Sequence, residues 1–181
     1  MRLKTKRLIL REWRKGDVND LVEGMNNYKI TKWLAFAPYP YTKKHAQNWI
    51  KYCNGLKKKR RTSFEFAIEL KSEKKVIGGM SLSKIDKFQG TAGGGIWINA
   101  KYQNNGYGTE AFGERISFAF GTLKLRRLEN GFLKGNPSSF KMQKRFGYKI
   151  EGIRRKAFRC MADGKIKDEY VTGLLKEEWK R

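Results

Sequence analysis

A short loop with two glycines is the part of the sequence best suited to chemistry. Residues 103–108 read Gln-Asn-Asn-Gly-Tyr-Gly and stand between an apolar segment and an amphipathic one. Glycine has no Cβ, so the backbone N–H groups of such a loop can approach a ligand closely. The unpaired N–H groups and positive dipole end of a following helix favour a phosphate or a pyrophosphate. Taken alone, the loop fits an anion-binding turn and a purely structural turn equally well.

Two other phosphate-binding motifs do not fit this loop. A Walker-type loop needs the pattern G-x-x-x-x-G-K-[ST], which the sequence lacks. A dinucleotide fingerprint needs a third glycine at position 111, where this chain has Ala111. His45 is the only histidine, and Cys53 and Cys160 stand far apart. We therefore expect no nucleophile–histidine–acid triad, no metal site, and reduced thiols.

Hydrophobic periodicity predicts the elements that must position the loop. Apolar and polar residues alternate over residues 64–70, which is typical of a half-buried strand. A helix after the loop is indicated by a buried stripe of Phe112, Ile116, Ala119, Phe120 and Leu123. Strands are expected at residues 8–13, 64–70, 76–82, 93–98, 127–133, 148–153 and 167–175. Helices are expected after the caps Asp17 and Thr42, after Gly106, and at residues 138–146, which gives an α+β sheet flanked by helices.

The loop and several further motifs resemble one known family. Gln103-x-x-Gly106-x-Gly108 resembles the [QR]-x-x-G-x-[GA] pyrophosphate signature of the GNAT superfamily of acetyltransferases. Residues 5–11 resemble the T-x-R-L-x-L-R opening of its ribosomal-protein-alanine N-acetyltransferases, the RimJ/RimL-like branch. Other motifs recur there in the same order: Phe66-Ala67-Ile68, Ile77-Gly78, Asn136-x-x-Ser139, Gly147-Tyr148, Glu151-Gly152 and the closing residues 174–179.

This resemblance covers nearly the whole chain and implies both fold and donor. It implies the GNAT fold, which is α+β with a mixed central sheet of about seven strands flanked by about four helices. The sheet would be splayed between its fourth and fifth strands. A single GNAT acetyltransferase domain would occupy residues 1–181. The implied activity is that of an N-acetyltransferase that uses acetyl-CoA and releases CoA.

The resemblance also assigns the cofactor contacts. The pantetheine arm would lie in the splay and bond the backbone of Ile96 and Ile98, on either side of Trp97. Asn136 matches the asparagine whose amide bonds that arm. Lys141 matches a position usually held by arginine, and it either faces the phosphates or is a solvated helix lysine. The pyrophosphate would rest on N–H groups of the residues that follow Gln103, namely Asn104, Asn105, Gly106, Tyr107, Gly108 and Thr109.

The catalytic groups are matched less completely. Acetyl transfer to an amine needs a neutral amine, donors for the oxyanion and a proton for the thiolate. Many members supply that proton from a tyrosine, which is Gln143 here, whereas the RimJ/RimL-like branch has a serine that matches Ser139. We expect Ser139 to be the acid or the donor to the thiolate, with a helix N-cap as the alternative. Relatives often carry a glutamate where this chain has Gly93, so no base is assigned; Glu65 and Glu69 are water-relayed candidates that we expect to face solvent.

The chain is strongly basic. Forty-one Lys and Arg against 17 Asp and Glu give a net charge of +24. Such a surface attracts RNA or another polyanion and repels polyamines and aminoglycosides; the alternative is a lysine-rich surface without a dedicated partner. The basic residues 57–61 would either dock on RNA or form a solvated helix end. No apolar run approaches the roughly 20 residues of a membrane helix, so we expect a cytoplasmic protein without a membrane partner.

Together these features favour acetylation of the N-terminal α-amino group of a protein, such as a ribosomal protein, by direct attack in a ternary complex. A small amine, amino acid or antibiotic is the alternative acceptor. A catalytically weak RNA- or ribosome-binding module is the alternative of another class, because the usual glutamate is missing at Gly93. By resemblance, an aromatic loop with Trp33, Phe36, Tyr39 and Tyr41 borders the acceptor pocket, with the tyrosines as acceptor contacts. We expect a monomer or a homodimer.

Overall fold

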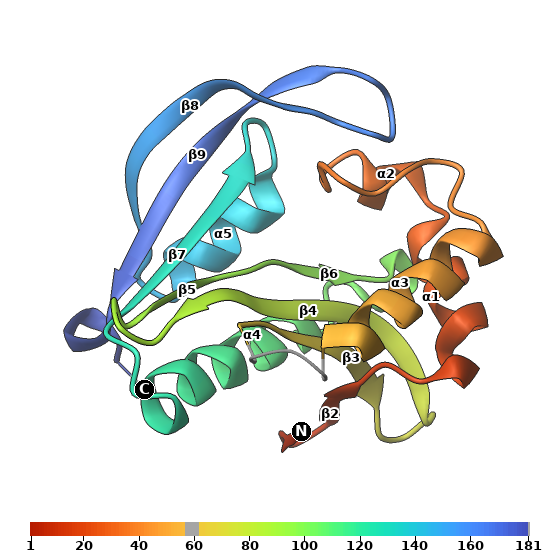
Figure 1. Ribbon diagram of the computed structural model, residues 1–181, viewed down its shortest axis with the longest axis horizontal. Coiled ribbons are helices and arrows are strands. Elements are labelled where there is room, and N and C mark those ends of the chain that lie inside the picture. Colours follow the sequence, from red (N-terminus) through yellow and green to blue (C-terminus); the bar gives the residue numbers. More distant parts are fainter. Residues whose placement is uncertain (57–61, 181) are drawn as a thin grey trace.

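A curved mixed sheet organises the molecule, as Figure 1 shows. The computed structural model describes residues 1–56 and 62–180. In this part of the chain one nine-stranded sheet has the order β1-β2-β3-β4-β5-β7-β9-β8, with β6 paired to β4 beside that path. The strands are β1 Arg2–Lys4, β2 Leu8–Glu12, β3 Phe64–Leu70, β4 Lys75–Asp86, β5 Thr91–Gly93, β6 Ile96–Ile98, β7 Arg127–Leu133, β8 Lys149–Arg159 and β9 Ile166–Leu175. The predicted GNAT architecture is confirmed, with β1 as a short strand that the sequence did not indicate.

The strand predicted at residues 93–98 is divided into β5 and β6. Gly94 causes the break, because its φ of +141° is a conformation that L side chains rarely adopt. A Cβ on Gly94 would also lie only 2.2 Å from the carbonyl oxygen of Ser81 on β4. The backbone therefore leaves the regular strand at this point, and β6 resumes two residues later.

The two halves of the sheet diverge at this break. β7 runs parallel to β5 and pairs with it only through Thr91 and Ala92. β6 pairs with β4 on its other side, in an antiparallel register that sets Trp97 opposite Gly79. The predicted splay between the fourth and fifth expected strands is thus confirmed.

Helices cover the two faces of the sheet with separate cores. On one face, Phe66 and Ile68 of β3 pack with Phe112 and Ile116 of α4. On the other face, Ala67 packs with residues of α1 and α3. The alternating side chains of residues 64–70 therefore face a core on each side of the sheet, rather than a core on one side and solvent on the other. The helices are α1 Val18–Met25, α2 Tyr28–Thr31, α3 Lys43–Leu56, α4 Tyr107–Ser117, which continues as the π-turn Phe118–Thr122, and α5 Pro137–Arg145. Short 3-10 turns lie at Lys15–Asp17, Ala100–Tyr102 and Lys176–Glu178.

The two predicted helix caps have different outcomes. Thr42 caps α3 as expected, since its hydroxyl accepts from His45 N at 3.3 Å and His45 Nδ1 accepts from Thr42 N at 3.1 Å. Asp17 stands at the N-cap position of α1 but makes no side-chain bond to that helix. Its carboxylate instead accepts two bonds from the buried Arg11 guanidinium, at 2.8 and 2.9 Å. A charged partner on the preceding strand, six residues earlier, therefore displaced the capping bond.

The β8–β9 hairpin arches away from the rest of the sheet and reaches the loop after α2 (Figure 1). β8 continues well past the predicted end at residue 153. At the tip, Met161 N donates to Ala35 O at 3.0 Å and Tyr28 Oη donates to Asp163 at 3.0 Å. The hairpin thus ties the C-terminal half of the sheet to the helical N-terminal region. Among the described helices, none combines the length and apolar character that a membrane span requires.

Candidate active site

The loop of residues 103–108, called the donor loop below, leads directly into α4. Gly106 is the N-cap of this helix with φ +77°, and Asn104 also has a positive φ of +64°. These two left-handed residues turn the chain so that the first backbone N–H groups of α4 lie at the loop. Gln103 Nε2 donates to Ile98 O at 2.9 Å, which ties the loop back to β6. The Gln103 side chain thus positions the loop.

Gly108 is required for space rather than for its backbone angle. A Cβ at this position would meet Met142 Cε at 3.0 Å and Ile98 Cγ1 at 3.4 Å. The first turn of α4 therefore lies in contact with β6 on one side and α5 on the other. This contact brings together three of the segments to which cofactor contacts were predicted.

The opening motif of the chain braces the donor loop. Thr5 Oγ1 and Arg7 N both donate to Glu110, at 2.5 and 2.7 Å, and Arg7 Nη1 donates to Asn105 O at 2.9 Å. The Arg7 guanidinium also lies 4.5 Å from the ring centre of Tyr107. Burial alone would raise the pKa of Glu110, but the bonds from Thr5 and Arg7 outweigh it and hold the pKa below its ordinary value. Two motifs about a hundred residues apart thus form one structural unit.

The free edge of β6 faces the splay. Gly95 O and Asn99 N bond to β4, at Ser81 N and Ile77 O. Strand residues alternate in the direction of their backbone groups, so those of Ile96 and Ile98 point to the opposite edge. That edge lies toward β7, with which β6 does not pair. An extended ligand with amide groups could therefore add to β6 as a strand would.

The Trp97 side chain has a packing role. Its ring lies against α1 and β4, because a Cβ on Gly24 or on Gly79 would come within 2.6 Å of it. It packs with the core on the α1 and α3 face. Only the backbone of Trp97 therefore belongs to the predicted cofactor strand.

Gly93 explains why the usual glutamate is absent. A Cβ at this position would lie 2.8 Å from the backbone oxygen of Glu129 on β7, closer than such contacts occur. Any longer side chain would force β5 away from β7 at the start of the splay. A base of this enzyme must therefore come from another strand or helix.

Asn136 and Ser139 lie side by side at the start of α5. Asn136 is the N-cap, and its Oδ1 accepts from Ser139 N at 3.2 Å. The alternative of Ser139 as the cap is thus wrong, because Asn136 already occupies that position with Pro137 after it. Asn136 Nδ2 donates to Ser139 Oγ at 3.1 Å, so the serine hydroxyl keeps its own proton to donate elsewhere. Lys141 is exposed one turn further along α5.

The position of the tyrosine found in many relatives is part of the core here. Gln143 is 5% exposed, and its Oε1 accepts from Thr172 Oγ1 on β9. A buried amide that is already hydrogen-bonded cannot deliver a proton to a leaving group. The geometry therefore leaves Ser139 as the hydroxyl next to Asn136.

One buried cation was missed by the sequence analysis. Arg115 of α4 is 0% exposed and bonds Ser81 O of β4, Asn130 Oδ1 of β7 and Tyr148 Oη, at 3.1, 3.1 and 3.2 Å. Its Nε has no hydrogen-bond partner among the described residues. Arg115 thus bridges the two halves of the sheet directly at the splay. The sequence did hold a signal for this burial. Arg115 stands three residues after Phe112, on the helix face that is otherwise occupied by apolar side chains.

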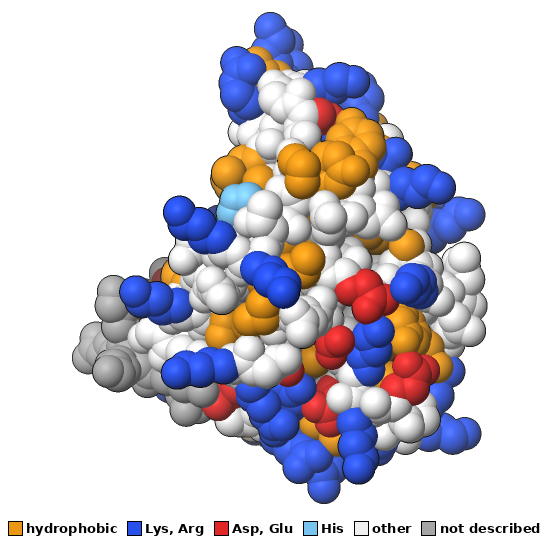
Figure 2. All heavy atoms as spheres, turned by 90° about the vertical axis from the view of Figure 1, so that its right-hand side faces the viewer, with side chains coloured by type: hydrophobic (Ala, Val, Ile, Leu, Met, Phe, Trp, Pro, Cys, Tyr) orange, Lys and Arg blue, Asp and Glu red, His pale blue; other side chains and the backbone are white. Residues whose placement is uncertain are grey.

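The aromatic loop after α2 divides into buried and exposed members. Tyr41 is 6% exposed and belongs to the core, and burial raises its pKa to about 12. It is therefore not an accessible acceptor contact. Phe36 and Tyr39 are 76% and 44% exposed, and Phe36 packs edge-on against Phe158 of the hairpin. Figure 2 shows hydrophobic side chains gathered among Lys and Arg at the upper end of this face. The basic residues 57–61 lie outside the described part of the chain.

A splayed strand edge beside a glycine-lined helix start defines a site for an extended ligand with an anionic end. The family model "Acetyltransferase (GNAT) domain" matches residues 7–149. The chain belongs to this family and is an acetyl-CoA-dependent N-acetyltransferase.

Relatives and solved structures agree with this assignment. The chain is 27% identical to the uncharacterized N-acetyltransferase YnaD of Bacillus subtilis over 180 residues, 99% of each chain. A GNAT-family acetyltransferase from Bacillus anthracis superposes with a TM-score of 0.84 at 24% identity, over 98% of this chain and all of that one. A ribosomal-protein-alanine acetyltransferase from Vibrio fischeri gives 0.77 at 21% identity, over 100% of both chains. A spermidine N-acetyltransferase from Vibrio cholerae, in complex with CoA and spermine, gives 0.79 at 20%, over 96% and 98%.

The residues present fit acetyl-CoA, which supplies the activated acetyl group. Gly108 lets the first turn of α4 pack closely against Ile98 of β6 and Met142 of α5. The first turn of α4 offers N–H groups to an anion, and the edge of β6 offers the backbone of Ile96 and Ile98 to amide groups. The predicted contacts are compatible with this geometry.

Proposed function

We propose that this enzyme belongs to the RimJ/RimL-like branch and acetylates the N-terminal α-amino group of a protein, such as a ribosomal protein. The acceptor amine would attack the thioester directly in a ternary complex. Support for the branch comes from the opening motif, whose Thr5 and Arg7 hold Glu110 at the donor loop. The N-terminal motif of that branch is thereby given a physical task in cofactor binding.

The observation that carries the choice of acceptor is the pairing of the carboxylate at the hairpin tip, beside the aromatic loop. Asp163 there pairs with Lys167 and accepts from Tyr28 Oη. Within the described residues, no group of three or more His, Cys, Asp or Glu side chains could hold a metal ion. A polyamine needs several unpaired carboxylates, and a net charge of +24 repels it further. Since a spermidine acetyltransferase shares this fold, fold alone does not select the acceptor.

In this proposal the catalytic proton comes from α5. Ser139 would donate to the departing thiolate, and its hydroxyl is oriented by Asn136 Nδ2 at 3.1 Å. The basic surface would hold the enzyme close to ribosomal RNA while the protein N-terminus enters the site. An RNA-binding module without turnover is the competing proposal, supported by the same charge and by the absence of a glutamate at Gly93.

An acceptor panel tests this proposal. Acetyl-CoA would be mixed with peptides bearing a free α-amine, the same peptides α-acetylated but containing lysine, spermidine, and an aminoglycoside. We expect thiol release with the free α-amine peptides at least tenfold above all other acceptors. Faster release with spermidine would overturn the choice of acceptor. Background release with every acceptor, together with RNA binding in physiological salt, would favour the binding module.

A further inference from the structure

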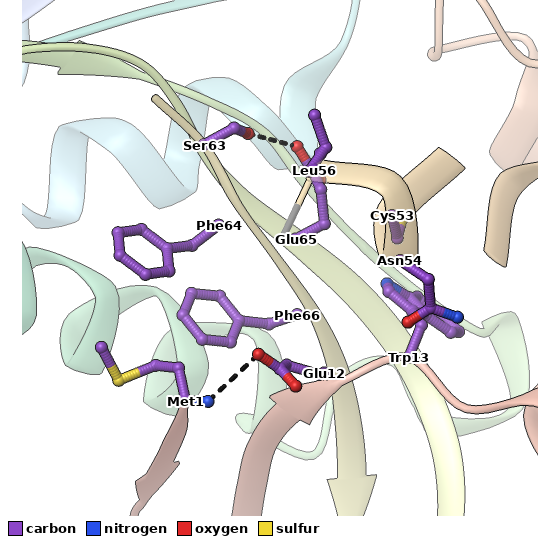
Figure 3. A pocket seen from close by; sticks show the side chains of 10 residues that line it. All are labelled: Met1, Glu12, Trp13, Cys53, Asn54, Leu56, Ser63, Phe64, Glu65 and Phe66. Atoms are coloured by element: carbon purple, nitrogen blue, oxygen red, sulfur yellow. Dashed lines mark hydrogen bonds and ion pairs between the residues drawn. The ribbon is translucent and has the colours of Figure 1, made fainter. Parts of the chain in front are cut away.

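Glu65 of β3 is a half-buried carboxylate with no cationic partner among the described residues. It lines a cavity of about 30 Å³ with Glu12 of β2 and Cys53 of α3 (Figure 3). This cavity lies on the β2 side of Glu65, and Ser81 and Gly95 are not among its lining residues. A cavity of this size has room for about two waters. The expectation that Glu65 faces solvent is therefore wrong, because α3 packs over this face of the sheet.

The neighbouring carboxylates on the same face are all committed to a cation. Glu69, four residues further along β3, pairs with the Arg11 guanidinium, as does Asp17. Glu65 differs from both. Among the described residues its hydrogen-bond partner is Ser63 Oγ, at 2.8 Å, and no ion pair reaches it. A buried carboxylate without a cation is costly to keep, which points to a use beyond stability.

The strand register places Glu65 in a row that ends at the splay. Glu65 is opposite Ser81 of β4, so the two side chains point to the same face. Ser81 in turn bonds Gly95, with Gly95 N donating to Ser81 Oγ and Ser81 N donating to Gly95 O, both at 2.9 Å. Two strand spacings separate Glu65 from Gly95, or about 10 Å. Gly95 is exposed, and the space where its Cβ would point is open.

We propose that Glu65 is the general base of the acetyl transfer and receives the acceptor proton through water held along the row Glu65, Ser81 and Gly95. This inference rests on the proposed acceptor class and deepens it. The amine nitrogen bonds the acetyl carbon as the bond from that carbon to sulfur breaks. The amine proton passes to water, and that water passes a proton to the Glu65 carboxylate. The thiolate takes its proton from the acid, which is Ser139 in the proposed function; Ser139 regains a proton from solvent water, and Glu65 releases its own to solvent.

The acidity of Glu65 suits an α-amine. Burial raises the pKa of Glu65 to about 7, and the bond from Ser63 offsets only part of this rise. An α-ammonium group has a pKa of about 8, within one unit of that value, whereas a lysine ammonium has one of about 10.4. Proton transfer to Glu65 is thus close to balanced for a protein N-terminus and roughly a few hundredfold less favourable for lysine.

Glu65→Gln tests the base, and Glu12→Gln is the matched control. Glu12 lines the same cavity and pairs with the Met1 amine at 3.2 Å. We expect Glu65→Gln to lower kcat about a hundredfold, with the Kd for acetyl-CoA from calorimetry unchanged and Glu12→Gln close to wild type. Ser81→Ala removes the relay hydroxyl without touching Glu65 and is expected to lower kcat about tenfold.

A second measurement does not depend on turnover. The titratable groups that face the cavity with Glu65 are the Met1 amine, Glu12 of β2 and the Cys53 thiol of α3. Carbon-13 NMR of the labelled glutamate carboxyls should show one that titrates with a midpoint near 7 and is missing in Glu65→Gln. Because the pKa is raised, ionisation of Glu65 lowers stability as pH increases from about 4.5 to about 7. The variant should therefore melt higher than wild type above pH 7 and equally below pH 4.5.

The outcomes separate the two proposals. If wild type acetylates α-amines and Glu65→Gln keeps its kcat within threefold, or if no carboxyl titrates near 7, Glu65 is not the base. If wild type releases no CoA with any acceptor, the proposed function fails, and the base fails with it.

Discussion

Two sides of the site meet at the splay between β6 and β7, and they are built from different materials. The donor side uses backbone groups and glycines of one continuous segment, β6 through the first turn of α4, braced by Arg7. The acceptor side that we propose is assembled from the loop after α2 and the tip of the β8–β9 hairpin, where Tyr28 bonds Asp163 across 135 residues of sequence. A site made of the backbone of one segment suits a single ligand. A site made of side chains from distant loops can be altered to suit a different acceptor. The comparison explains why the donor is established for this chain and the acceptor is a proposal.

The largest effect is expected on the donor side. Gly108→Val would place branched carbons against Met142 and Ile98, where a single Cβ already comes within 3.0 and 3.4 Å. Calorimetry should show that the affinity for acetyl-CoA falls at least a hundredfold. Gly152→Val on β8 is the control, because a Cβ there meets nothing within 4 Å. Equal affinities of the two variants would remove Gly108 from the donor site.

Ser139 is the proposed proton donor, so its effect should fall on turnover alone. Ser139→Ala removes the hydroxyl that accepts from Asn136. We expect kcat to fall about ten- to a hundredfold, with the Kd for acetyl-CoA within twofold of wild type. The exposed neighbour Ser138 provides the control, as Ser138→Ala. A change in affinity without a change in kcat would assign Ser139 to binding instead of proton transfer.

Arg115 joins the halves of the sheet on which the two sides depend. Arg115→Met leaves the buried acceptors Ser81 O and Asn130 Oδ1 without their donor, and each such loss costs about 1–3 kcal/mol. We expect the free energy of unfolding in urea to fall by about 2 kcal/mol and the KM for acetyl-CoA to rise. Arg155→Met, on the exposed strand β8, should change neither. An Arg115→Met protein as stable as wild type would contradict a bridging role.

The smallest effect concerns the brace of the donor loop. Bonds from Thr5 and Arg7 lower the pKa of Glu110 despite its burial. A lowered pKa contributes stability that is present above the unfolded value of about 4.3 and lost as pH falls through the folded value. Melting curves of wild type and Glu110→Gln should therefore converge in acid, and differ above about pH 5. A constant difference at all pH values would mean that the charge of Glu110 contributes nothing.

The donor side was also the more predictable one from sequence. Local patterns were sufficient for the 103–108 loop, the cap at Thr42 and the apolar stripe of α4, because each depends on residues within a few turns. Contacts between distant segments decided the rest. Glu69 pairs with Arg11 from 58 residues away, and α3 covers Glu65. A pattern in a single sequence does not show which distant side chain or helix will pack against a given residue.

The most direct test of the account is a crystal structure of this protein with CoA. We predict the pantetheine arm along the free edge of β6, bonded to the backbone of Ile96 and Ile98. We predict the pyrophosphate on the N–H groups of residues 104–109, with Ser139 Oγ within hydrogen-bond reach of the sulfur. Density for CoA elsewhere, or a pyrophosphate held by surface lysines instead of the donor loop, would contradict the account.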